Sequence, residues 1–226
     1  MPIIAARRYT MGKAHSADVA VTGEPAPEGG LPSGCFDWIG LCDPTADEMA
    51  RIGRQFGLHP LAIEDALHPR QLPKVDIYGK QLFVVARTAS LVPGGDEIAY
   101  GQTTFFLGEQ FIVSVRLGSA RAHVDLRRML EADAEHLAEG TDYVLHAVLD
   151  FLVDGYLPIA DQFEEVALEI EEAAIDQFPR PETIRRIFRL RRELRRFERI
   201  IAPMEAMVAR LVEAELPAID PSALPW

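Results

Sequence analysis

Several features that would assign this chain to a common class are scarce or missing. Its 226 residues include only two cysteines, Cys35 and Cys42, whose spacing fits neither a C-x-x-C metal pair nor a disulfide framework. The N-terminus lacks the apolar core of about 7–15 residues that a signal peptide needs. The longest apolar stretch, near 143–153, is interrupted by His146 and Asp150. It falls short of the about 18 uncharged residues that cross a bilayer, so we expect a soluble chain in a reducing, cytosolic compartment.

Catalytic motifs are also missing. The six histidines form no zinc-binding motif, the glycines form no phosphate-binding loop, and no serine or cysteine lies in a nucleophile motif. We therefore expect a protein that is not an enzyme. The net charge of −12 argues against nucleic-acid binding, which depends on neutralising phosphates with Lys and Arg. The same charge suits a surface that attracts cations.

The alternation of apolar and polar residues predicts an α/β fold with a mixed β-sheet sandwiched between helices. Expected strands are residues 3–9, 18–22, 35–41, 75–91, 97–107 and 110–117, with a turn at 93–96. A capping box from Thr45 to Glu48 opens a helix that Gly57 closes. Further helices are expected at 59–68 and 122–139.

The C-terminal third predicts a long antiparallel helical hairpin. Apolar residues recur at steps of three and four from 145 to 173 and again from 187 to 211, which is typical of coiled-coil packing. Thr141 is the expected cap, Pro179 breaks the chain, and Pro158 and Pro203 should bend their helices. Acidic residues of the first helix would face eight arginines at 185–199 of the second. An RNA-binding arginine helix is the rival interpretation, and it requires those arginines to be uncovered.

The segment 59–68 contains the best candidate site. Pro60 suits a helix start and Pro69 a helix end, and the helix between them presents Glu64 and Asp65 away from its apolar face. Solvated charges, a hard-cation site and acid/base chemistry all fit this pattern. Asp150 is a second candidate, because it lies among apolar neighbours and a buried carboxylate needs a hydrogen bond, a cation or water.

The run HPLAIEDALHPRQLPKVDIYGKQLFVVAR at 59–87 resembles the soluble domain of the CorA-type magnesium/cobalt transporters. The likeness continues in YVLHAVLDFLVDGYLPIADQFEEVALEIEE and in RRIFRLRRELRRFERIIAPMEAMVARL. Leu72 departs from the family pattern, which often has arginine there. The resemblance implies an α/β domain at 1–140, the hairpin at 141–216, and at 217–226 a linker toward a stalk helix and membrane segment absent from this chain.

The same resemblance implies a cytosolic regulatory domain, on the cytoplasmic side of the cell membrane, that senses Mg²⁺ and gates a pentameric channel. Glu64, Asp65 and Asp150 match residues that help bind the regulatory cation, and a further acid would come from the stalk. The cation is expected to be Mg²⁺, with Co²⁺ or Zn²⁺ as other candidates, and the fragment alone a monomer or weak oligomer. Two alternatives remain open: a zinc-transporting relative, or a stand-alone soluble protein that binds cations or a partner through its hairpin.

Overall fold

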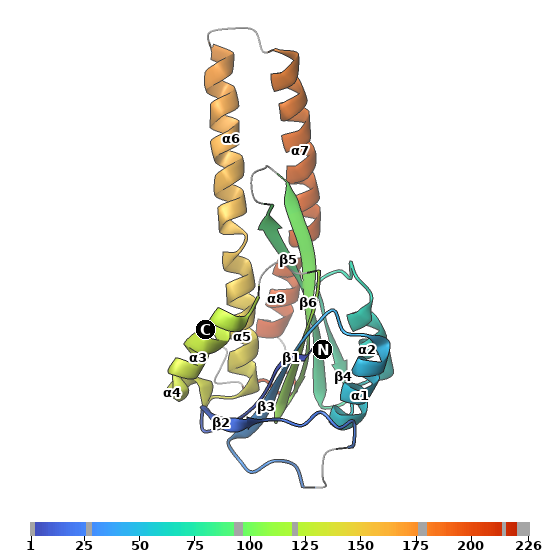
Figure 1. The fold of residues 1–226 in the computed structure, drawn as a ribbon. Coiled ribbons are helices and arrows are strands. Elements are labelled where there is room, and N and C mark those ends of the chain that lie inside the picture. The colour runs from blue at the N-terminus through green and yellow to red at the C-terminus, as the bar shows by residue number, and fades with distance from the viewer. Residues whose placement is uncertain are drawn as a thin grey trace.

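A computed structural model describes residues 3–25, 29–92, 97–118, 122–175, 180–213 and 216–220. Figure 1 shows a twisted sheet between helical layers, with two long helices running side by side beyond one end of it. Within the described residues the sheet has seven strands: β1 (Ile3–Thr10), β2 (Lys13–Asp18), β3 (Cys35–Cys42), β4 (Lys74–Tyr78), β5 (Gln81–Leu91), β6 (Ile98–Gly108) and β7 (Phe111–Leu117).

The helices fall into a short N-terminal pair and a longer C-terminal set. The pair is α1 (Ala46–Phe56) and α2 (Pro60–Leu67). The later helices are α3 (Val124–Ala132), α4 (Ala134–Leu137), α5 (Thr141–Asp154), α6 (Leu157–Ile175), α7 (Pro181–Ile201) and α8 (Pro203–Glu213). Thr45 and Glu48 form the predicted capping box of α1, and Gly57 closes that helix in the left-handed conformation.

The strand order is β2-β1-β3-β7-β6-β5-β4, and every neighbouring pair is antiparallel except β3 with β7. The sheet is therefore mixed. Alternate residues of β5 point to opposite faces: Val84 joins a core under α3, α5 and α8, whereas Val85 joins a core under α1 and α2. Helices cover both faces, so the predicted αβα sandwich followed by long helices is confirmed.

Several element boundaries differ from the prediction. The strand expected at 18–22 lies at Lys13–Asp18 instead. The single strand expected at 75–91 is a hairpin, because Tyr78 pairs with Gln81 and Gly79 has a φ of 63°. The helix expected at 122–139 divides into α3 and α4 where Asp133 accepts a hydrogen bond from the backbone N–H of His136. The expected turn at 93–96 and Pro179 lie outside the described residues.

Pro158 and Pro203 were expected to bend their helices, and the C-terminal helices are interrupted near both prolines. α5 gives way to α6 just before Pro158, and α7 to α8 just before Pro203. The cap is different: Gly140 occupies the N-cap of α5, and the Thr141 hydroxyl donates to the Gly108 carbonyl at 3.0 Å. Because α5 shares a core with the sheet, the division of the chain at residue 140 stays a proposal.

One helical stretch, Thr141–Glu172, is long and apolar enough to cross a membrane by length and composition alone. Its first part is α5, whose buried apolar residues pack against the sheet; these are Val144, Leu145, Val148, Leu149 and Leu152. Packing on the sheet accounts for the apolar composition of α5 without a membrane.

Candidate functional site

The acidic pair lies on α2, whose start is well defined. His59 is the N-cap, its Nδ1 accepts the N–H of Leu61 at 3.3 Å, and Pro60 follows at the first helical position. The His59 ring also stacks on Tyr78 at the end of β4. With Ala62 and Ala66 buried toward the sheet, the opposite side of α2 faces outward and carries the pair.

Asp65 is half-buried and already has cationic and polar partners. Its carboxylate accepts Lys74 Nζ at 2.7 Å and Gln71 Nε2 at 2.9 Å. Lys74 also contacts Asp76 at 2.7 Å. Burial lowers the pKa of Lys74, but the hydrogen bonds that its ammonium group donates to Asp65 and Asp76 outweigh burial and raise that pKa overall. The ammonium group therefore stays charged and partly neutralises this acidic surface.

Glu64 is exposed beside Asp65. Its backbone carbonyl, rather than its carboxylate, is the group that contacts His68: the carbonyl accepts the His68 N–H at 3.2 Å and lies 2.8 Å from His68 Nδ1. The His68 ring is thus tied to the helix end. The Glu64 side chain remains directed to solvent, where a hydrated cation can approach it.

Asp150 is exposed on α5, so the expectation that it lies buried among its apolar neighbours is wrong. It borders a groove with Val208 and Val212 of α8. α5 covers one face of the sheet and α2 the other, so one chain does not bring Asp150 to Glu64 and Asp65. Within the described ranges, no three His, Cys, Asp or Glu side chains are grouped to hold a metal ion.

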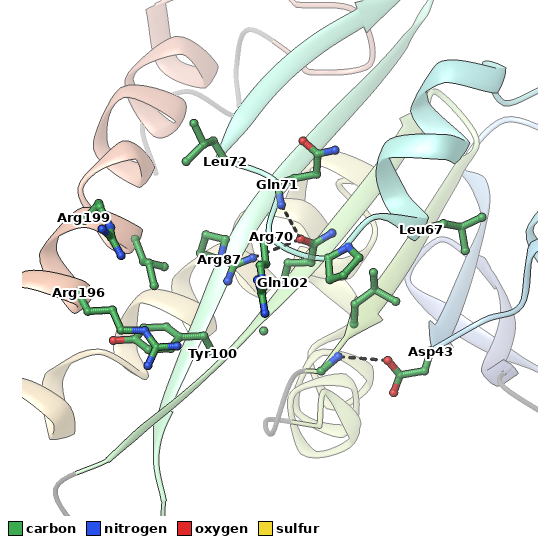
Figure 2. A pocket seen from close by; sticks show the side chains of 15 residues that line it. Asp43, Leu67, Arg70, Gln71, Leu72, Arg87, Tyr100, Gln102, Arg196 and Arg199 are labelled. Carbon is green, nitrogen blue, oxygen red and sulfur yellow. Dashed lines mark hydrogen bonds between the residues drawn. The ribbon is translucent and has the colours of Figure 1, made fainter. Parts of the chain in front are cut away.

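A cleft that the sequence prediction missed has a volume of about 720 Å³. Figure 2 shows it between the segment after α2, the middle of β5 and β6, and the C-terminal half of α7. Four arginines line it: Arg70, Arg87, Arg196 and Arg199. The sequence contained one signal of this cleft, namely Arg87, a charged residue inside the apolar run of β5. Its three companions come from segments that are distant in sequence, so their convergence follows from the fold.

Comparison of the sequence with known proteins identifies the family of this chain. The model of the CorA-like Mg2+ transporter protein family matches residues 33–225. The "Putative metal ion transporter YfjQ" of Bacillus subtilis is 28% identical over 189 residues, which cover 81% of this chain and 56% of that protein. The chain spans about half the length of the curated relatives it matches.

Solved structures share the fold. The soluble domain of CorA from Methanocaldococcus jannaschii superposes with a TM-score of 0.72 at 14% identity, covering 100% of this chain and 86% of that one. The ZntB cytoplasmic domain from Vibrio parahaemolyticus gives 0.71 at 13% identity, covering 99% and 83%. At these identities the structures establish the fold, and the family match over 33–225 establishes membership. The chain belongs to the family of CorA-like Mg²⁺ transporter proteins.

Proposed function

We propose that this chain is the cytosolic, regulatory part of a divalent-cation transporter, in which Glu64, Asp65 and Asp150 contribute to a Mg²⁺ site between subunits. The observation that carries the proposal is the outward placement of the Glu64–Asp65 pair on α2. Carboxylates on an accessible surface suit Mg²⁺, which keeps several waters and takes one or two protein carboxylates. Family membership and the net charge of −12 support the same assignment.

A shared cation would require two copies of the chain. α2 and α5 lie on opposite faces of the sheet, so Asp150 of one copy could approach the acidic pair only of another. Acidic surfaces brought together in an oligomer repel when no cation lies between them. We therefore propose that Mg²⁺ joins neighbouring subunits of a pentamer and holds the channel closed, and that loss of the cation separates them and favours opening.

Lys74 adds a constraint on this site. Its ammonium group lies 2.7 Å from Asp65 and already neutralises part of the carboxylate charge. A cation that binds Asp65 directly must compete with Lys74, whereas a hydrated cation at Glu64 need not. We therefore expect the fragment to bind Mg²⁺ weakly, in the millimolar range or above, and Co²⁺ or Zn²⁺ to compete for the same carboxylates.

Titration calorimetry with Mg²⁺ tests the proposal on this chain. The wild type should bind weakly and be stabilised by about 1.4 kcal/mol at ten times Kd, as mass action requires. The Glu64→Gln/Asp65→Asn double variant, which removes both carboxylates of the pair on α2, should lose most of that heat. Asp161→Asn, an exposed carboxylate on α6, is the matched control and should bind like the wild type. Equal heats from all three proteins would show that these carboxylates do not form the site.

A further inference from the structure

The proposed function gives no role to the cationic cleft, which is the space lined by Arg70, Arg87, Arg196 and Arg199 (Figure 2). Only one carboxylate, Asp43, belongs to its described lining. Asp43 accepts the N–H of Gly118 at 3.1 Å and lies across the cleft from Arg196 and Arg199. Four guanidinium groups against one carboxylate give the cleft positive charge in a chain whose net charge is −12.

Arg87 is the central residue of this cleft. It lies in the middle of β5 with 7% of its surface exposed, and burial lowers its pKa. Its Nη1 donates to Gln102 Oε1 at 3.3 Å, and no carboxylate of the described ranges pairs with it. A buried cation is costly unless an anion or several hydrogen bonds compensate it. The four remaining N–H groups of the guanidinium fork are suited to oxyanions.

Gln102 fixes the position of Arg87 and of the loop above it. Besides Arg87, its Oε1 accepts the Gln71 N–H at 3.1 Å, and its Nε2 donates to the His68 carbonyl at 3.0 Å. The loop holds Arg70 at a φ of 75°, a conformation that L-residues other than glycine seldom adopt. Strained backbone of this kind is often retained at binding sites, and here it places a second guanidinium at the cleft.

α7 supplies the other wall. The Arg196 guanidinium lies over the Tyr100 ring at 4.7 Å, with Glu193 3.8 Å away on the helix. The Tyr100 hydroxyl is buried, and no hydrogen-bond partner for it lies in the described ranges. Arg199 follows one turn later on the same side of the helix. Guanidinium groups from three separate segments thus converge on one space.

We propose that the cationic cleft binds a phosphate-bearing small anion. Arginine forks match phosphate oxygens in geometry and charge, and binding there would compensate the buried charge of Arg87. The volume of about 720 Å³ accommodates a ligand as large as a nucleotide. This inference does not rest on the cation proposal, because the two sites share no residue.

Titration calorimetry with sodium tripolyphosphate and with ATP tests the proposal on this chain, in magnesium-free chloride buffer of fixed ionic strength. We expect the wild type to bind at least one of the two. Equal affinities would identify the phosphate chain as the recognised group, and tighter ATP binding would identify a nucleotide; both support the proposal. Inorganic phosphate, titrated alongside, should bind more weakly because it reaches fewer guanidinium groups.

The variants locate the site. Arg196→Gln/Arg199→Gln removes two guanidinium groups from exposed helix positions and should weaken binding by about tenfold or more. Arg87→Gln should do the same, and the α7 double variant carries the test if Arg87→Gln fails to fold. Arg189→Gln, an exposed arginine of α7 outside the cleft, should bind like the wild type. Absence of binding, or equal weakening in Arg189→Gln, would overturn the proposal.

Discussion

The helices α5 and α7 are both long and both carry apolar residues at helical spacing, yet they differ in how many of these residues are buried. α5 places six residues in the interior, including Val148 at 0% exposure. α7 has no buried residue, and its apolar Leu194 is 41% exposed. The sheet explains the difference, because α5 lies against it while much of α7 extends past its end (Figure 1). Packing on the sheet therefore stabilises α5, whereas α7 has little tertiary packing of this kind.

α7 packs on a small apolar cluster beside β5 and β6 that is separate from the core under α5. Tyr156, Ile159 and Phe163 are buried there, and Leu190 and Phe197 of α7 pack against them from a partly exposed position. Few buried contacts mean a low free energy of local opening. We therefore expect the outer part of the hairpin to open more readily than α5.

The largest expected effect is that of Val148→Asp. The new carboxylate would lie in the core between α5 and the sheet, so we expect a loss of about 4 kcal/mol or more in the free energy of unfolding. Urea denaturation followed by circular dichroism measures the loss. Val153→Asp makes the same change on the same helix at a position 41% exposed, and it should cost less than about 1 kcal/mol. Similar losses in both variants would contradict the burial difference along α5.

A smaller effect is expected for Tyr156→Phe, at the boundary between the two regions. The Tyr156 hydroxyl donates to the Arg87 carbonyl at 2.6 Å, and burial raises the pKa of this phenol. Removing the hydroxyl leaves a buried carbonyl without its partner, which should lower the free energy of unfolding by about 1–2 kcal/mol. The partly exposed Tyr143 provides the control, since Tyr143→Phe should change stability by less than about 0.5 kcal/mol. An unchanged free energy of unfolding in Tyr156→Phe would show that a water molecule donates to the Arg87 carbonyl in place of the phenol hydroxyl.

The fold was predictable from sequence where local signals and burial agree. The Thr45–Glu48 capping box and Pro60 fixed two helix starts, and both helices lie where the pattern placed them. The hairpin at Gly79 and Lys80 was missed because strand-forming residues lie on both sides of it, Val75 and Ile77 before it and Leu82 onward after it, and Gly79 was not taken as the turn signal that it is. Thr141 has the right residue type for a cap, but a tertiary hydrogen bond to Gly108 takes its hydroxyl. Only the folded chain provides that competing partner.

The candidate site was predictable only in part. The outward position of Glu64 and Asp65 follows from helical spacing on α2, and the structure agrees with it. Asp150 was expected to be buried because its sequence neighbours are apolar; yet a helix turns about 100° per residue, so Asp150 faces solvent while Leu149 faces the core. The cationic cleft combines β5, α7 and the loop after α2, and no local pattern reports such a convergence.

The regular apolar spacing of α7 gives the last and smallest expected effect. A buried coiled-coil seam would make Leu194→Asp cost several kcal/mol, but at 41% exposure this side chain has little apolar contact to lose. We expect a loss of about 1 kcal/mol in the free energy of unfolding. Leu190→Asp, one turn earlier in the apolar cluster with Tyr156, should cost more. Denaturation of both variants at two protein concentrations provides the measurement. The contrary result would be that Leu194→Asp lowers the free energy of unfolding as much as Leu190→Asp does, with a larger loss at the higher protein concentration. That result would show that self-association covers this face of α7. The contrast with α5 would then hold only for the isolated chain.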